Sequence, residues 1–427
     1  MNPSEIEAYL TKKERDGLLY PQYQDFSLYN AVCTTLNFFG FDEKESLPLP
    51  RHFTKKTKKV VFFLIDGFGF SQYKKIALSY DFFKAVKVTG CLFPITTVFP
   101  STTASALTTV ATALTPQEHG LFEWNLYLPE IDEVVQTLPF APLGKNAQAE
   151  SLRERGIPGE VLFKINNTIF KRLKKKGVRS YVFRHASITG STYSSLVSKD
   201  AQTIGYSHLS DLLGQLKALL ENEKGPAFFY VYWADIDSQG HRFGPDSYEY
   251  NVESMLFFDA LWKGLVQSMD KAHAADTVLL LTADHGQVPV DPQKTIYLSS
   301  DTHFQRFLAK SPRGKTILPW GSPRDIFIMC KKDVIRKAYA YLNRSYGDKA
   351  HILFVKEAIE KNLFGVKKPS TRFLERCGDI ILLPKKNDTI WYEHIAGEFF
   401  NLRGHHGGLT KEEMLIPFCM AYLEDLV

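Results

Sequence analysis

The 427-residue sequence predicts an α/β fold, in which a doubly wound, mostly parallel sheet carries a smaller α/β insertion. The first observation is a set of apolar runs bounded by charged or polar residues, which indicates strands buried on both faces. These runs occupy residues 58–66, 181–183, 228–233, 278–282 and 415–421. The second observation is that helical stretches such as 209–220 lie between them. In doubly wound sheets, ligands bind beyond the carboxyl ends of the strands.

The chain divides into three predicted parts. Residues 1–50 form an N-terminal extension whose aromatic residues pack on the core, and residues 51–290 together with 401–427 form that core. The length of the whole chain is sufficient for one large α/β domain with an insertion. Residues 291–400 form the insertion or cap subdomain, in which short strands are predicted at 325–330, 352–355 and 379–383.

The composition excludes several classes of protein. A net charge of +5 is mild for this length and argues against a dedicated nucleic-acid-binding protein. The five cysteines form no CxxC pair, which is typical of a reduced compartment and not of a disulfide framework. The N-terminus lacks the apolar core of a signal peptide, and no apolar run has membrane-spanning length. We therefore expect a cytoplasmic protein, with export without a cleavable signal as the alternative. The sequence leaves the oligomeric state open.

Residues 99–120 combine hydroxyl side chains with a helical pattern. Ser101, Thr102 and Thr103 precede small and apolar residues that recur at steps of three and four, as in an amphipathic helix. One interpretation is that these hydroxyls only cap a buried helix. The other is that they lie beside the unpaired N–H groups and the positive dipole end of the helix, where a phosphate or an alkoxide nucleophile is stabilised.

Carboxylate and imidazole side chains lie at the ends of the predicted strands: three clusters follow a strand, and the fourth precedes the last strand. Each alone is typical of a turn or loop, but four such clusters at strand ends predict a common site. These side chains are ligands of zinc, and also of manganese or iron. Three Asp, three His and one hydroxyl suffice for two metals bridged by a phosphate. The clusters are Asp66; Asp235, Asp237 and His241; Asp284 and His285; and His405 and His406.

Five ordered motifs make the sequence similar to a known family. They are IDGFG at 65–69, a Thr-rich helix ending in HG at 119–120, DxxxH followed by FG at 237–244, DHG at 284–286 and HHGG at 405–408. Together they resemble the alkaline phosphatase superfamily, and within it the type I phosphodiesterase/nucleotide pyrophosphatase branch. The resemblance covers residues 58–427. It implies a metal-dependent catalytic core with two divalent metal ions, expected to be Zn²⁺.

The resemblance also implies roles for individual residues. Thr103 would be the nucleophile, because the family places that residue sixteen positions before the His of the HG motif, which is His119 here. The same hydroxyl would complete the first of two zinc sites. The first site would comprise Asp66, Thr103, Asp284 and His285, and the second Asp237, His241 and His406.

The sequence departs from the family pattern at two positions. Val98 stands before Phe-Pro, where many members have the nucleophilic Thr, and Ala106 stands where those members have an Asn that contacts the phosphate. Thr102 is therefore the alternative nucleophile. Among the ligands, Asp235 is the alternative to Asp237, and His405 is the alternative to His406.

The predicted reaction is metal-dependent hydrolysis of phosphodiester or nucleotide pyrophosphate bonds through a covalent phosphothreonine intermediate. The expected partner is a small phosphodiester or nucleotide. A phosphomonoesterase or phosphonate hydrolase with the same two-metal site is the alternative, and a non-catalytic, metal-stabilised binding protein is a remote one. A monoesterase needs a cation for the third phosphate oxygen, and residues 99–120 contain no Arg. The candidate substrate-binding residues are Phe99, Trp124 and Tyr127.

Overall fold

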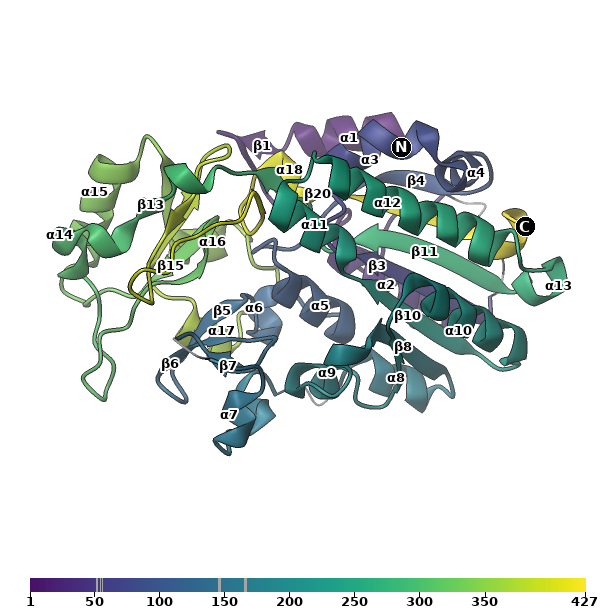
Figure 1. Cartoon of the computed structure of the whole chain (residues 1–427), viewed down its shortest axis with the longest axis horizontal. Coiled ribbons are helices and arrows are strands. Elements are labelled where there is room, and N and C mark those ends of the chain that lie inside the picture. The colour runs from purple at the N-terminus through teal and green to yellow at the C-terminus, as the bar shows by residue number, and fades with distance from the viewer. Residues whose placement is uncertain (51–52, 54, 56, 145–146, 165–166) are drawn as a thin grey trace.

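A seven-stranded sheet forms the centre of the computed structural model (Figure 1), in the order β4 (Cys91–Thr96), β20 (Leu415–Tyr422), β11 (Thr277–Ala283), β3 (Lys59–Ile65), β10 (Ala227–Trp233), β8 (Arg179–His185) and β9 (Gln202–Tyr206). β20 runs antiparallel to both of its neighbours, whereas the pairs from β11 to β9 are parallel. The structure describes all residues except 51–52, 54, 56, 145–146 and 165–166. Residue 51, the predicted start of the core, therefore lies outside the described residues.

Helices cover both faces of this sheet: α10 (Leu209–Asn222) and α12 (Tyr248–Ala260) on one, and α2 (Leu28–Phe38), α5 (Thr103–Thr112) and α8 (Ile169–Lys175) on the other. The aromatic contacts of β10 assign the faces. Phe257 of α12 packs on Trp233, with ring centroids 5.7 Å apart. Phe170 of α8 packs on Phe228 and Tyr230. Because successive side chains of a strand point to opposite faces, odd and even residues of β10 contact different helix layers.

The first fifty residues are integrated into the core. Helix α1 (Pro3–Thr11) lies beside β4, and most of α2 is buried. Tyr23 connects two distant segments, because its hydroxyl donates to the carbonyl of Leu363 (3.0 Å) and accepts the N–H of Phe99 (3.1 Å). The N-terminal segment thereby supports the loop that precedes α5.

A second sheet lies within residues 291–400. Its strands are antiparallel, in the order β14 (Trp320–Ser322), β15 (Asp325–Ile328), β17 (Ile380–Pro384) and β16 (Ala350–Phe354). Helix α15 (Ile335–Tyr346) shares a separate apolar core with this sheet. A three-stranded sheet, which the sequence pattern does not predict, packs against β14 through the rings of Tyr127 and Trp320, 5.7 Å apart. Its strands are β5 (Asn125–Leu128), β6 (Glu133–Gln136) and β7 (Ala141–Pro142).

The predicted fold class is confirmed. All five predicted apolar runs coincide with central strands, and β20 is the antiparallel exception in a mostly parallel sheet. The two strands that the sequence analysis missed, β4 and β9, lie at the edges of the sheet. The shorter helices used below are α6 (Pro116–His119), α9 (Thr192–Val197), α11 (Asp235–Phe243) and α18 (Lys411–Met414).

Candidate metal centre

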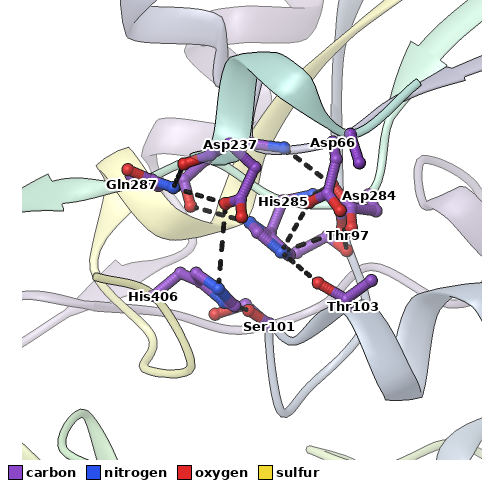
Figure 2. Close-up of polar contacts among 12 residues, drawn as sticks. Asp66, Thr97, Ser101, Thr103, Asp237, Asp284, His285, Gln287 and His406 are labelled. Carbon is purple, nitrogen blue, oxygen red and sulfur yellow. Dashed lines mark hydrogen bonds and ion pairs between the residues drawn. The ribbon is translucent and has the colours of Figure 1, made fainter. Parts of the chain in front are cut away.

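Two parallel strands bring the first carboxylates together. Ile65 of β3 pairs with Ala283 of β11, so the residues that follow, Asp66 and Asp284, leave the sheet side by side. His285 comes next in the chain and lies between them and Thr103, the first residue of α5 (Figure 2).

The side chains of this first group converge on one imidazole nitrogen. Nε2 of His285 lies 3.2 Å from Asp284 Oδ2 and 3.3 Å from Asp66 Oδ1. The hydroxyl Oγ1 of Thr103 is 3.2 Å from the same nitrogen. All four side chains are buried. The four residues thus form a compact set of oxygen and nitrogen donors.

A second group lies beside the first. Asp237 and His241 are four residues apart in α11, which places them on one helix face, and Nε2 of His241 is 3.3 Å from Asp237 Oδ2. His406 comes from the loop before α18, and its Nε2 is 3.2 Å from Nε2 of His241. The rings of His406 and His285 stack with centroids 3.5 Å apart, so the two groups are adjacent.

Hydrogen bonds fix the carboxylates of the first group and leave one oxygen of each without a donor. The hydroxyl of Tyr232 donates to Asp66 Oδ2. The backbone N–H groups of Gly67 (3.0 Å) and His285 (2.8 Å) donate to Asp284 Oδ1. The remaining oxygens, Asp66 Oδ1 and Asp284 Oδ2, are buried and have no hydrogen-bond partner within the described part of the chain. A buried anionic oxygen without a partner is costly, and a cation would remove that cost.

The histidine rings are held in the orientation that metal ligands require. In each ring Nδ1 faces a backbone carbonyl, which fixes the proton on Nδ1 and leaves the lone pair of Nε2 directed at the carboxylates. Burial lowers the pKa of His406 to about 4 and that of His285 well below its usual range, so both imidazoles are neutral, the form that binds a metal. The carbonyl contacts are His285 to Gly286 (3.2 Å), His241 to Gly404 (2.8 Å) and His406 to Ser101 (2.8 Å).

The electrostatics of the two groups also favour cations. Burial, followed by the neighbouring Asp284, raises the pKa of Asp66 well above its usual range, and burial raises the pKa of Asp284 to about 7. For the described residues, the ion-pair contacts of Asp66, Asp237 and Asp284 are with histidines only. Two clusters have donor atoms within 4.8 Å of one another: Asp66, Asp284 and His285, and Asp237, His285 and His406. His285 belongs to both clusters, and such mixed carboxylate and imidazole donors fit two divalent cations.

The three hydroxyl residues at the start of α5 have different contacts. Thr103 Oγ1 faces the first group, whereas Thr102 Oγ1 is 3.4 Å from the carbonyl of Phe122. Ser101 Oγ donates to the carbonyl of Gly408 (2.8 Å). Thr102 occupies the N-cap position of α5 but forms no side-chain capping bond. The capping interpretation therefore does not explain these hydroxyls.

A cavity of about 1220 Å³ opens over both groups. Trp124 lines it, together with Trp391 and Phe400 from the C-terminal half of the chain. The structure does not bring the other two predicted substrate contacts to this cavity. Phe99 is fully buried against Phe364, with ring centroids 5.1 Å apart, and Tyr127 is buried with its hydroxyl donating to Asp132 (2.9 Å). Both aromatic rings serve packing, Phe99 against Phe364 and Tyr127 against Trp320.

The comparisons with known proteins identify the family. The family model described as type I phosphodiesterase / nucleotide pyrophosphatase matches residues 60–408. The chain belongs to this family. Its alignment with ectonucleotide pyrophosphatase/phosphodiesterase family member 3 of Bos taurus is 24% identical over 246 residues, covering 56% of this chain and 26% of the relative. A venom phosphodiesterase of Crotalus durissus collilineatus is 23% identical over 267 residues, covering 60% of this chain and 30% of the relative. The match thus spans less than a third of these relatives.

Solved structures share the fold. Murine ectonucleotide pyrophosphatase/phosphodiesterase 5 superposes with a TM-score of 0.62 at 18% identity, covering 84% of this chain and 87% of the other. A phosphonoacetate hydrolase from Sinorhizobium meliloti superposes with a TM-score of 0.58 at 18% identity, covering 86% and 90%. This chain therefore has the same α/β fold as these structures.

The two alternative ligands that the sequence left open, Asp235 and His405, are placed differently from Asp237 and His406. The side chain of Asp235 is exposed at the start of α11, whereas Asp237 is buried in the second group. Nδ1 of His405 faces the backbone of His406, at 2.8 Å from both its N–H and its carbonyl oxygen. Sequence reasoning missed Gln287, whose side-chain amide donates to Asp237 Oδ1 and, at 3.1 Å, to the Asp237 carbonyl. Its position directly after the DHG motif was the available signal.

In the described part of the chain, none of the helices has the length and apolar character needed to cross a bilayer.

Proposed function

We propose that this protein hydrolyses phosphodiester or nucleotide pyrophosphate bonds, with Thr103 as the nucleophile. One observation carries the proposal: the Thr103 hydroxyl lies 3.2 Å from the nitrogen on which the first group of ligands converges. Zinc ions bound by the two groups would lower the pKa of that hydroxyl and neutralise charge on the phosphate oxygens. Family membership supports the same reaction class.

In the proposed reaction, Oγ1 of Thr103 attacks phosphorus in line and the P–O bond to the leaving group breaks. The product of this step is a phosphoryl ester of Thr103 and a released alcohol or phosphate, whose oxygen takes up the proton lost by the threonine hydroxyl. Water then attacks phosphorus, the Oγ1–P bond breaks, and the hydroxyl is restored with a proton from that water. The N-terminus of α5 supports an anion here, because its dipole is positive where Thr102 and Thr103 line the cavity. Ala106 is buried and offers no side-chain donor, so these backbone groups take a larger share of that task.

We assign diesters or pyrophosphates, rather than monoesters, as the substrate class. The cavity presents Trp124, Trp391 and Phe400, which suit an apolar or nucleobase group on the second arm of a diester. The predicted subdomain at 291–400 contributes two of these rings, which supports a role for it in choosing the substrate.

The test compares kcat/KM of the zinc-loaded protein for bis-p-nitrophenyl phosphate and p-nitrophenyl phosphate. We expect the diester to be preferred at least tenfold, which corresponds to about 1.4 kcal/mol of barrier. A monoester preference of the same size would assign the protein to the phosphomonoesterases. Inactivity toward both esters and toward nucleotide pyrophosphates would refute the proposed function.

A further inference from the structure

A buried arginine lines the cavity without an acidic partner. Arg184, near the carboxyl end of β8, is only 6% exposed and borders the same cavity as Thr103. Its Nη2 donates to Ser198 Oγ at 2.6 Å, and its Nε is buried without a hydrogen-bond partner. Across the residues that the structure describes, no Asp or Glu lies within ion-pair distance of this guanidinium.

The groups around Arg184 are hydroxyls. Tyr193, Tyr230 and Tyr232 are its neighbours, and the hydroxyl of Tyr230 is itself buried without a partner in the described residues. A guanidinium stays protonated in proteins, so this site holds a positive charge. Burying a charge without a counter-ion is costly. An unpaired guanidinium beside a free hydroxyl is therefore a site for an anion that enters through the cavity.

The position of Arg184 separates it from the reacting phosphate. β8 is two strands from β3, whose end carries Asp66, and two strand spacings amount to roughly 10 Å. Tyr193 of α9, a neighbour of Arg184, contacts Thr108 of α5, with 3.0 Å between the hydroxyl oxygens. Thr108 is five residues, or about 7.5 Å along the helix, from Thr103. At this separation an anion bound at Arg184 would be a different group from the phosphate at Thr103.

We propose that Arg184 and the hydroxyl of Tyr230 form a subsite for a second oxyanion of the substrate, a phosphate or a carboxylate. This inference rests on the proposed function, because it assumes that Thr103 acts on the first phosphate. It defines the substrate as a phosphodiester or pyrophosphate that carries a further anionic group, such as a polyphosphate or an acidic leaving group.

The test measures inhibition of bis-p-nitrophenyl phosphate hydrolysis by matched acids. Butylphosphonate provides one anionic group, whereas butane-1,4-bisphosphonate and 5-phosphonopentanoate add a phosphonate or a carboxylate, and ethylene and hexylene homologues vary the spacing. We expect one of the doubly anionic acids to bind about 10- to 100-fold more tightly than butylphosphonate. That preference should fall to about one in Arg184→Gln and recover in part in Arg184→Lys. Tighter binding of the bisphosphonate would indicate a phosphate as the second anion, and tighter binding of 5-phosphonopentanoate would indicate a carboxylate.

The matched control is Arg179→Gln. Arg179 lies on the same strand at its opposite end and pairs with Glu223 (2.6 Å), so its loss should leave the preference intact. Metal chelation by the bisphosphonates is common to all variants and cancels in the comparison. Should Arg184→Gln fail to fold, Tyr230→Phe removes one donor only and should weaken the preference about fivefold.

Two results would overturn the inference. An unchanged preference in folded Arg184→Gln would mean that the arginine is structural, and an equal loss for butylphosphonate and the doubly anionic acids would mean that it contacts the reacting phosphate. Failure of the proposed function is distinguishable, because the wild-type protein would then not hydrolyse bis-p-nitrophenyl phosphate. Titration calorimetry with the same acids would still report the subsite in that case.

Discussion

Removing one partner of a buried ion pair should lower both the stability of the fold and the affinity of the metal centre for zinc. Arg324, between β14 and β15, donates to Glu413 of α18 through two parallel bonds of 3.0 Å each, and both side chains are fully buried. Glu413 also accepts the N–H of Gly408 (3.0 Å), and its carbonyl accepts the N–H of Gly286 (2.9 Å). The Glu413 carboxylate therefore holds the loop that carries His406, and the Glu413 backbone carbonyl holds the loop that carries His285.

Substitution Arg324→Met would leave the Glu413 carboxylate buried and unpaired. Burial tends to raise the pKa of Glu413, but Arg324 and the hydrogen bonds outweigh it and keep that pKa below its usual range. Losing one partner of such a pair costs about 3–5 kcal/mol, whereas removing both in Arg324→Met/Glu413→Leu should cost clearly less than the sum of the single changes.

The free energy of unfolding is measured by urea denaturation of the metal-free and metal-loaded proteins. The control is Lys84→Met, which breaks an exposed ion pair with Asp81 (2.9 Å) and should change stability by no more than about 0.5 kcal/mol. Arg324→Met should also bind zinc more weakly than wild type. The reasoning would be refuted if Arg324→Met lowered the free energy of unfolding by less than about 1 kcal/mol. It would also be refuted if the loss in the double variant equalled the sum of the losses in the single variants.

Three further predictions concern the centre and its surroundings. Elemental analysis of protein purified without chelator should give two divalent ions per chain, and EDTA should lower Tm because the carboxylates of Asp66 and Asp284 then repel; a ratio near zero with full activity in EDTA contradicts this. Thr103→Ala should abolish turnover of bis-p-nitrophenyl phosphate with metal content retained, and Thr102→Ala should cost much less; the reverse order would make Thr102 the nucleophile. Burial raises the pKa of Glu123 to about 8, so the folded protein keeps a proton that the unfolded chain loses near 4.5. Stability should therefore fall as pH rises from about 4.5 to about 8, and Glu123→Gln should flatten this trend in Tm; an unchanged slope would exclude that contribution.

Strong local patterns made the core strands predictable. β3, β10 and β11 are completely buried, so they form short apolar runs rich in β-branched and aromatic residues, which is typical of strands covered on both faces. β9 was missed because four of its five residues are not buried, so its sequence QTIGY shows no apolar pattern. β4 contains Pro94, which argues against a strand but is tolerated because β4 is an edge strand.

The same contrast applies to the site. Asp66, Asp284 and His285 were predictable because they directly follow buried strands, and ligands bind at the carboxyl ends of the strands in an α/β sheet. Tyr232 and Arg184 were not, because an aromatic residue or an arginine inside a strand has no local signal for its role. Their contacts, with Asp66 and with the cavity, exist only after β3, β10 and β8 are placed side by side.

The central claim is that Thr103 forms a covalent bond to phosphorus. The most direct measurement is mass spectrometry of the zinc-loaded protein, quenched in acid during turnover of bis-p-nitrophenyl phosphate, with fragmentation of the peptide that carries Thr102 and Thr103. We predict a p-nitrophenylphosphoryl adduct on Thr103 that is absent from Thr103→Ala and from protein treated with EDTA. An adduct on another residue, or full turnover by Thr103→Ala, would contradict the account.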